Sequence, residues 1–161
     1  MNTNIEKQIE RAKQDAISLG LIVRFIRHSE SGRSTADAEK ALGVPAECII
    51  KSLIMFSPST AEYFGFIISG SSRLNIKKAC RQSGVPKLKF ASPEQVEALT
   101  GFRIGGVPPT SLRFCKLVLI DSRVFTRESA IGAGGDEHCG MEFSPAELAK
   151  SIGARTVDIS E

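Results

Sequence analysis

Lys51 is the residue whose type and position most strongly suggest chemistry in this sequence. It stands third in the apolar, strand-like run IIKSLIMF at residues 49–56. Strand alternation puts Lys51 on the face shared with Leu53 and Met55. In a dry core an ammonium group loses several kcal/mol of hydration unless an acid or a wet cavity receives it. Lys51 therefore pairs with an acid such as Asp121, reaches solvent from an edge strand, or projects into a ligand pocket.

A second candidate for chemistry is the glycine- and proline-rich segment 101–111, GFRIGGVPPTS. Gly105 and Gly106 allow a close approach of the backbone to a ligand or a positive φ, and the two following prolines stiffen the chain. Rigid, exposed N–H groups of this kind can hold an oxyanion or a ribose phosphate. The same pattern also marks an ordinary tight turn, as does the glycine-rich segment 132–135, so both interpretations stay open.

The common enzyme motifs are missing. There is no G-x-S-x-G elbow, Walker loop, H-E-x-x-H or strand-linked G-x-G-x-x-G, and only His28 and His138 could serve histidine-dependent catalysis. The four cysteines lie far apart without a C-x-x-C pair, and the adjacent His138 and Cys139 are poorly spaced for one ion. The sequence predicts reduced thiols, no metal and no cofactor, and chemistry performed by a lysine, glycine backbone and bound water.

Composition indicates one ordinary globular unit. The 161 residues suit a single domain over residues 1–161, and 42% hydrophobic with 24% charged residues excludes a disordered or fibrous chain. A formal net charge of +3 permits a polyanionic partner without requiring one. No apolar run is long enough for a membrane span, and the first residues lack the pattern of a secretory signal. We therefore expect a cytoplasmic protein that has no membrane partner.

Helix signals and strand signals alternate irregularly along the chain. Polar caps, apolar spacing and closing glycines predict helices at 3–20, 34–43, 75–84, 92–101 and 144–153. Strand-like runs occupy 21–27, 49–56, 63–69, 87–90, 116–121, 140–143 and 155–159. The runs at 49–56 and 63–69 predict a hairpin, because a Ser-Pro-Ser-Thr turn joins them. This order favours an α+β domain with a mixed sheet over a parallel doubly wound sheet.

Taken together, these segments resemble the YbaK/EbsC-type family of aminoacyl-tRNA deacylases, the prolyl-tRNA editing domains. The resemblance runs over nearly the whole chain, and its pieces stand in the family's order: the strand ending in His28, the helix from Thr35 leading into Leu42-Gly43-Val44-Pro45, Lys51-Ser52, Ala91-Ser92-Pro93-Glu94, Thr100-Gly101, Gly105-Gly106-Val107-Pro108-Pro109, Ile120-Asp121, the glycines of 132–135, and Ser144-Pro145 before Glu147-Leu148. The fold expected on this basis is a single α+β domain whose mixed, mostly antiparallel sheet curls into a partial barrel with surrounding helices.

The resemblance implies hydrolysis of the ester between a wrongly attached small amino acid, such as Cys, Ala or Ser, and a tRNA, with tRNA-Pro or a related tRNA expected. It implies that Lys51 is the catalytic residue, that no metal or cofactor is used, and that water or the substrate's own hydroxyl or thiol attacks the carbonyl. The substrate-binding residues that it implies are His28, Thr35, Ser52, Gly105, Gly106, Val107, Pro109, Ser111 and Gly134.

Three positions depart from the family pattern. Ser111 stands where the family turn usually ends in glycine, Gly140 where some members carry an aspartate, and Ile26 where some carry an aromatic residue. Asp136 and Glu137 lie close upstream of Gly140 and are candidate substitutes for that acid. These departures leave the amino-acid preference open. They also support an alternative function, a non-catalytic module that binds a tRNA end or a nucleotide.

Partners are inferred from charge and from the resemblance. Basic residues expected to contact the tRNA body are Arg73, Lys77, Lys78 and Arg81, followed by Lys87 and Lys89. A solvated helix face is the alternative interpretation of the same residues. The small net charge predicts weak, salt-sensitive binding. The resemblance implies that an aminoacyl-tRNA synthetase delivers the substrate, and we expect a monomer or a weak homodimer.

Overall fold

A computed structural model describes residues 3–161 of the chain. In this part the helices are α1 (Thr3–Ser18), α2 (Thr35–Leu42), α3 (Ile76–Ser83), α4 (Pro93–Thr100) and α5 (Pro145–Ile152), with 3-10 helices η1 (Ala46–Cys48), η2 (Pro109–Phe114) and η3 (Ser122–Thr126). The strands are β1 (Arg24–Arg27), β2 (Ile50–Ser57), β3 (Glu62–Ser69), β4 (Lys89–Phe90), β5 (Leu117–Asp121), β6 (Ala130–Ala133), β7 (Cys139–Phe143) and β8 (Arg155–Val157).

The helices begin and end where the sequence places polar caps and glycines. Ser92 accepts a hydrogen bond from the backbone N–H of Gln95, whose side chain returns one to Ser92, so α4 begins with a complete capping box. Ser34, Asn75 and Ser144 cap α2, α3 and α5 with half of this arrangement. Each side chain accepts a hydrogen bond from the backbone N–H three residues further on. The glycine that closes each of these four helices adopts the left-handed conformation that favours glycine.

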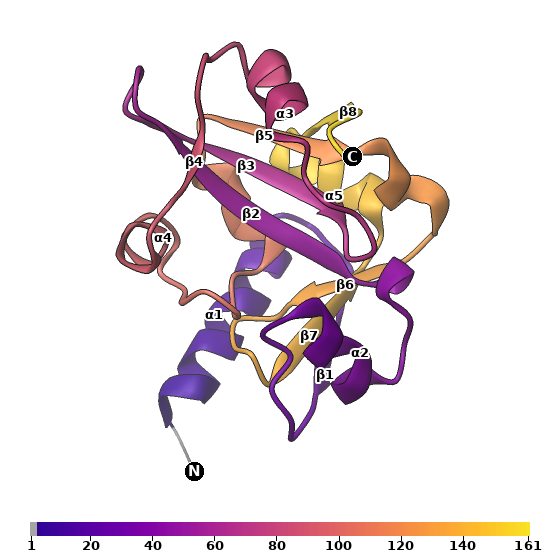
Figure 1. The fold of residues 1–161 in the computed structure, drawn as a ribbon. Helices are drawn as coiled ribbons and strands as arrows, with labels where there is room; N and C mark the ends of the chain where they lie inside the picture. Colours follow the sequence, from indigo (N-terminus) through magenta and orange to yellow (C-terminus); the bar gives the residue numbers. More distant parts are fainter. Residues whose placement is uncertain (1–2) are drawn as a thin grey trace.

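The strands form two sheets, which Figure 1 shows in the upper and lower parts of the molecule. The upper sheet has the order β4-β2-β3-β5-β8, in which β3, β5 and β8 run parallel and the other neighbours antiparallel. The lower sheet is antiparallel with the order β1-β7-β6. A single bridge between Ile49 and Ile131 links the two sheets. The predicted α+β class, mixed sheet and β2–β3 hairpin are confirmed, and within residues 3–161 the sheet does not close into a barrel.

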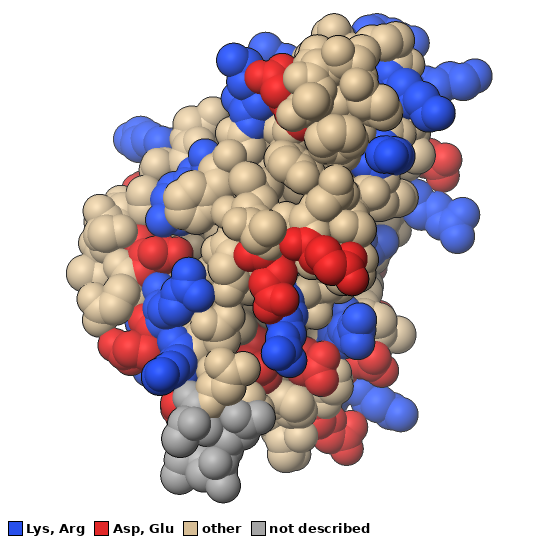
Figure 2. Space-filling model, turned by 90° about the vertical axis from the view of Figure 1, so that its left-hand side faces the viewer, with Lys and Arg blue, Asp and Glu red and all other residues tan. Residues whose placement is uncertain are grey.

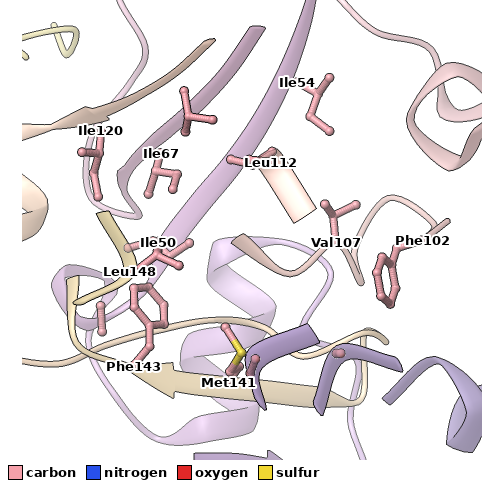
Figure 3. Packing of buried hydrophobic residues seen from close by; sticks show 14 of the residues in the cluster. Ile50, Ile54, Ile67, Phe102, Val107, Leu112, Ile120, Met141, Phe143 and Leu148 are labelled. Atoms are coloured by element: carbon pink, nitrogen blue, oxygen red, sulfur yellow. The ribbon is translucent and has the colours of Figure 1, made fainter. Parts of the chain in front are cut away.

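Two hydrophobic clusters fill the two faces of the upper sheet. Ile54, Ile67 and Ile120 belong to the larger cluster, which extends to Met141 of the lower sheet and to Leu148 of α5 (Figure 3). The smaller cluster lies on the opposite face and includes Met55 and Phe66 of the sheet, Ala79 of α3 and Ile159 near the C-terminus. Side chains of β2 therefore alternate between two buried faces, so a charged residue in this strand needs a local opening.

The structure adds elements that the sequence did not predict. Gly132 and Ala133 lie in β6, so only Gly134 and Gly135 of the predicted loop 132–135 lie outside a strand. The segment that follows Pro108 is a 3-10 helix, η2, which no sequence pattern indicated. None of the helices in residues 3–161 is long and apolar enough to cross a membrane.

Candidate active site

A cavity of about 530 Å³ opens at the edge of β2, between the two sheets. Its walls come from α2 and the segment before it, from β2, from the segment that contains α4, and from β6, β7 and the loop between them. This volume is typical of a site for a small molecule and far too small for a macromolecule. Of the predicted site residues, those that line it are His28, Thr35, Lys51, Ser52, Gly105 and Val107.

The cavity exists because β2 has an incomplete neighbour. β4 pairs with β2 only at Met55 and Phe56, and a hydrogen bond from the N–H of Ala91 to the carbonyl of Ile54 ends this pairing. Main-chain groups of a strand point alternately to its two edges, so Ser52, two residues before Ile54, presents its N–H and C=O on the same side. No strand of the described chain pairs with Ser52 there. The cavity is thus bordered by main-chain groups open to a ligand.

The Ser52 side chain adds a second polar group to this border. Its hydroxyl oxygen is buried and has no hydrogen-bond partner within residues 3–161. A buried hydroxyl without a partner carries a desolvation cost that a ligand can remove. Ser52 therefore offers a hydroxyl as well as backbone groups to whatever enters the cavity.

Lys51 reaches the cavity without meeting an acid. Its half-buried side chain donates a hydrogen bond of 2.6 Å from Nζ to the main-chain oxygen of Ser72. A lysine has three N–H donors, and no other acceptor contacts Nζ within residues 3–161. Burial and, after it, the positive charge of Arg73 hold the pKa of Lys51 below the ordinary value for lysine. One N–H donor of the Lys51 ammonium is hydrogen-bonded in this position, so the others can still donate to a ligand.

Asp121 is not the partner of Lys51, which corrects the sequence-based candidate. Its fully buried carboxylate accepts hydrogen bonds from the backbone N–H groups of Ile159 and Ser160 and from Arg123. These contacts fasten the C-terminal segment to the end of β5. Asp121 is a structural anchor, and the charge of Lys51 faces the cavity unpaired by a carboxylate.

Of the two adjacent glycines, Gly105 lines the cavity and Gly106 does not. Gly105 has a φ of 96° and lines the cavity. The N–H of Gly106 already donates to the carbonyl of Arg103, and its carbonyl accepts from Gly135. A Cβ added at Gly106 would lie 2.8 Å from the oxygen of Gly135, so only glycine fits between these loops. Both backbone groups of Gly106 are therefore used in hydrogen bonds within the protein.

Three further predicted residues lie outside the cavity lining. Pro109 is buried behind the wall, where its ring packs on Gly132. Ser111 is fully buried and donates its hydroxyl hydrogen to the carbonyl of Pro108 at 2.6 Å. Gly134 donates its N–H to Cys139. Ser111 therefore holds its own turn together, and it does not narrow the cavity.

Charged groups also line the cavity. Glu137 lines the cavity, and one carboxylate oxygen would lie 3.5 Å from a Cβ at Gly105. No cation pairs with this carboxylate within residues 3–161. Asp136 also lines the cavity, but one of its oxygens accepts hydrogen bonds from the backbone and ring of His138. Arg33 is exposed at the rim and packs against Gly105. Gly140 lies in the lining as a residue without a side chain.

The remaining predicted residues are placed as follows. Nδ1 of His28 lies 2.6 Å from the carbonyl of Glu30, which fixes the ring at the cavity wall. Lys78 is committed to Asp158 and to the carbonyl of Ser160. The exposed Lys77 and Arg81, together with residues 86–88, line a shallow depression beside α3. In Figure 2 the upper part of the molecule, at the height of α3 in Figure 1, carries mostly basic side chains.

Arg33, Phe90 and Ile104 are among the lining residues that the sequence did not single out. Phe90 and Ile104 are apolar yet exposed, which no sequence pattern indicates. Within residues 3–161, no three His, Cys, Asp or Glu side chains gather as they do around a metal ion.

Comparison with known proteins agrees with this geometry. The model of the aminoacyl-tRNA editing domain matches residues 29–151, which includes every segment that lines the cavity except His28. The chain belongs to the aminoacyl-tRNA editing domain family. The YbaK/EbsC-type resemblance seen in the sequence is thereby confirmed.

The relatives of this editing domain include synthetases and free-standing proteins. A proline–tRNA ligase of Nitratidesulfovibrio vulgaris is 35% identical over 83 residues, which are 52% of this chain and 14% of the ligase. The chain thus spans a small part of the ligases that it matches. YwhH of Bacillus subtilis, of unassigned function, is 28% identical over 74% of this chain and 75% of its own length. EbsC of Enterococcus faecalis, named as a candidate deacylase of Cys-tRNA(Pro) and Cys-tRNA(Cys), is 28% identical over 53% of this chain and 51% of its own.

Solved structures give the same assignment over nearly the whole editing domain. A candidate trans-editing enzyme for prolyl-tRNA synthetase superposes with a TM-score of 0.84 at 30% identity, covering 96% of this chain and 97% of that one. The hypothetical protein APE2540 also superposes with a TM-score of 0.84, at 32% identity over 94% of this chain and 99% of its own.

Proposed function

We propose that this editing domain hydrolyses the ester that joins a wrongly attached small amino acid to a tRNA, with tRNA-Pro as the expected acceptor and Cys, Ala or Ser as the expected amino acid. The observation that carries this proposal is Lys51, an ammonium in a small cavity that is held by one main-chain carbonyl and by no carboxylate. The family assignment supports the class of reaction, and the relatives named for prolyl-tRNA support the choice of tRNA.

In this proposal the ester carbonyl enters the cavity beside Lys51. Water, or a hydroxyl or thiol of the substrate itself, attacks the carbonyl carbon, and the carbonyl oxygen becomes an oxyanion. An N–H donor of Lys51 stabilises that charge, and the backbone N–H of Ser52 stands at the same border. The intermediate then collapses, the bond to the ribose oxygen breaks, and that oxygen leaves as a hydroxyl after taking up the proton that the attacking water, hydroxyl or thiol releases. When water attacks, the products are the free amino acid and uncharged tRNA.

Glu137 completes the site in this proposal, since an aminoacyl ester carries an α-ammonium group near its carbonyl. The unpaired carboxylate of Glu137 lines the same cavity as Lys51, so in this proposal it accepts from the α-ammonium while Lys51 contacts the carbonyl. The surrounding lining is largely apolar, with Ile50, Ile54 and Ile131. Such a lining favours a small amino acid over a charged one.

The test is a panel of tRNA-Pro molecules charged with Ala, Ser, Cys or Pro and incubated with the pure protein. We expect the wild type to shorten the ester half-life of at least one small amino acid. Lys51→Ala should lower the rate about a hundredfold or more, as the loss of one oxyanion donor does. Lys150→Ala removes an exposed lysine on α5 and should leave the rate unchanged.

The main alternative is a module of the same fold that binds a tRNA end or a nucleotide without turnover. Unchanged half-lives across the whole panel, together with retained binding of the charged tRNA, would select this alternative. Addition of prolyl-tRNA synthetase to the same reactions tests whether delivery by a synthetase is needed. A rate that rises only with the synthetase present would support action in trans.

A further inference from the structure

Two exposed apolar side chains flank the mouth of the cavity. Phe90 is 58% exposed and Ile104 is 39% exposed, and both belong to the cavity lining. Their neighbours on the same wall, Ala91, Val96 and Val107, are buried. The wall therefore changes from buried apolar residues inside to exposed apolar residues at the rim. Exposed apolar groups that continue a ligand cavity are typical of a binding surface.

The backbone holds both rim residues in place. Phe90 belongs to β4, which pairs with β2 at Met55, and the next residue, Ala91, donates to Ile54. Ile104 belongs to the turn that the hydrogen bond from Gly106 to Arg103 closes. The capped helix α4 connects the two positions. The rim is thus prepared before a ligand arrives, which lowers the entropy cost of binding.

We propose that Phe90 and Ile104 hold the terminal nucleobase of the charged tRNA by stacking and apolar contact. This inference rests on the proposed function, because an acyl ester beside Lys51 leaves its ribose and base at the mouth. Each nucleobase has an apolar face, and an aromatic ring binds such a face without regard to sequence. The apolar rim adjoins the cavity directly, so the base that is covalently attached to the ester is the occupant within reach.

Charge at the rim fits the same occupant. Arg33 is exposed and packs against Gly105, the residue that follows Ile104. A nucleoside 5′-phosphate just outside the cavity would meet the guanidinium of Arg33 beside the apolar rim.

The test compares two alanine esters, of which only one carries a nucleoside. Alanyl-adenosine has the ribose and the base, and alanine methyl ester lacks both. We expect Phe90→Ala to raise KM for alanyl-adenosine about tenfold or more, with little change in kcat and none in the KM for the methyl ester. Phe90→Trp should restore the KM for alanyl-adenosine, since an indole also stacks. Ile104→Ala should act in the same direction with a smaller effect.

Phe114→Ala is the matched control, since Phe114 is 48% exposed in η2, packs on Arg113 and does not line the cavity. It should leave both KM values unchanged. Equal effects of Phe90→Ala on the two substrates, or no effect on either, would overturn the proposal. So would sedimentation showing that Phe90→Ala converts a dimer to a monomer with adenosine binding unaltered, since a second copy would then be the occupant.

Adenosine itself separates this inference from the proposed function. Wild type should bind adenosine in an NMR titration that shifts the ring signals of Phe90, and ribose should produce no such shift. Adenosine binding without ester hydrolysis would refute the proposed function and keep the base site. Hydrolysis without adenosine binding would refute the base site and keep the proposed function.

Discussion

Nζ of Lys51 donates to the main-chain oxygen of Ser72, and the next residue along the chain, Arg73, brings a second positive charge to the same region. This hydrogen bond orients the ammonium of Lys51 without neutralising its charge. A carbonyl fixes the direction of the side chain, and it has no negative charge that would compete with a substrate for the ammonium. This arrangement suits a lysine that must donate to a developing oxyanion.

The pKa of Lys51 should rise when Arg73 is replaced. Arg73→Gln removes a positive charge that disfavours the ammonium form, so the pKa moves toward the ordinary value for lysine. Chemistry that needs the ammonium would then persist to higher pH in the variant than in the wild type. NMR titration of the Lys51 side chain measures this shift, with the exposed Lys150 as internal reference. An unchanged pKa would mean that burial alone lowers it.

Glu137→Gln should weaken recognition of the α-ammonium group. We expect KM for alanyl-tRNA to rise about tenfold, because a hydrogen bond to a charged group is worth about 1.5 kcal/mol. Acetylated alanyl-tRNA, which lacks the ammonium, serves as the comparison and should respond equally to both proteins. Glu147→Gln, at an exposed position of α5, is the control. Equal losses on both substrates would contradict an ammonium site at Glu137.

Lys77 and Arg81 test the predicted contact with the tRNA body. They lie one turn apart on α3, and both are exposed. Replacing both by Gln should reduce the slope of log K against log salt by about 1 to 2, the value for one or two lost phosphate contacts. Filter binding at several salt concentrations gives the slope. Lys150→Gln should leave the slope as it is, and an unchanged slope in the double variant would favour a solvated helix face.

Gly106→Ala should destabilise the wall of the cavity. The new Cβ would lie 2.8 Å from the oxygen of Gly135 and 2.9 Å from Cα of Asp136, both of which are backbone atoms. Overpacking of this kind costs about 1–3 kcal/mol in the free energy of unfolding. Gly140→Ala is the comparison, since its Cβ would have one tight contact, 3.0 Å to the side-chain Cγ2 of Ile131, and no backbone atom closer than 3.7 Å apart from its neighbours. Urea unfolding of both variants should show the larger loss for Gly106→Ala.

Local signals predicted the helices and most strands well, because those signals act over a few residues. Capping residues such as Ser92 and closing glycines such as Gly101 satisfy helix ends wherever the helix lies. The strand at Ala130–Ala133 was missed, since it has one β-branched residue and contains a glycine. Its pairing with β7 decides its conformation, and no local pattern encodes that pairing.

The candidate site was also predictable only in part, because local signals mark Lys51 but do not identify its distant neighbours. An apolar strand with one lysine indicated an unusual environment, and the structure places Lys51 at a cavity. The acceptor of Lys51 is a main-chain carbonyl 21 residues away, which residue types alone do not identify. Asp121 was therefore a reasonable candidate and a wrong one. The exposed rim formed by Phe90 and Ile104 depends on where β4 ends, and only the fold reveals it.

The lining of the cavity extends from His28 to Gly140, so segments distant in the chain enclose it jointly. A fragment that held only the β2–β3 hairpin would carry Lys51 on a bare sheet edge with nothing around it. The enclosure therefore vanishes when any one of its walls detaches. Heat inactivation of the protein should consequently follow its cooperative melting curve, without an earlier step confined to one loop.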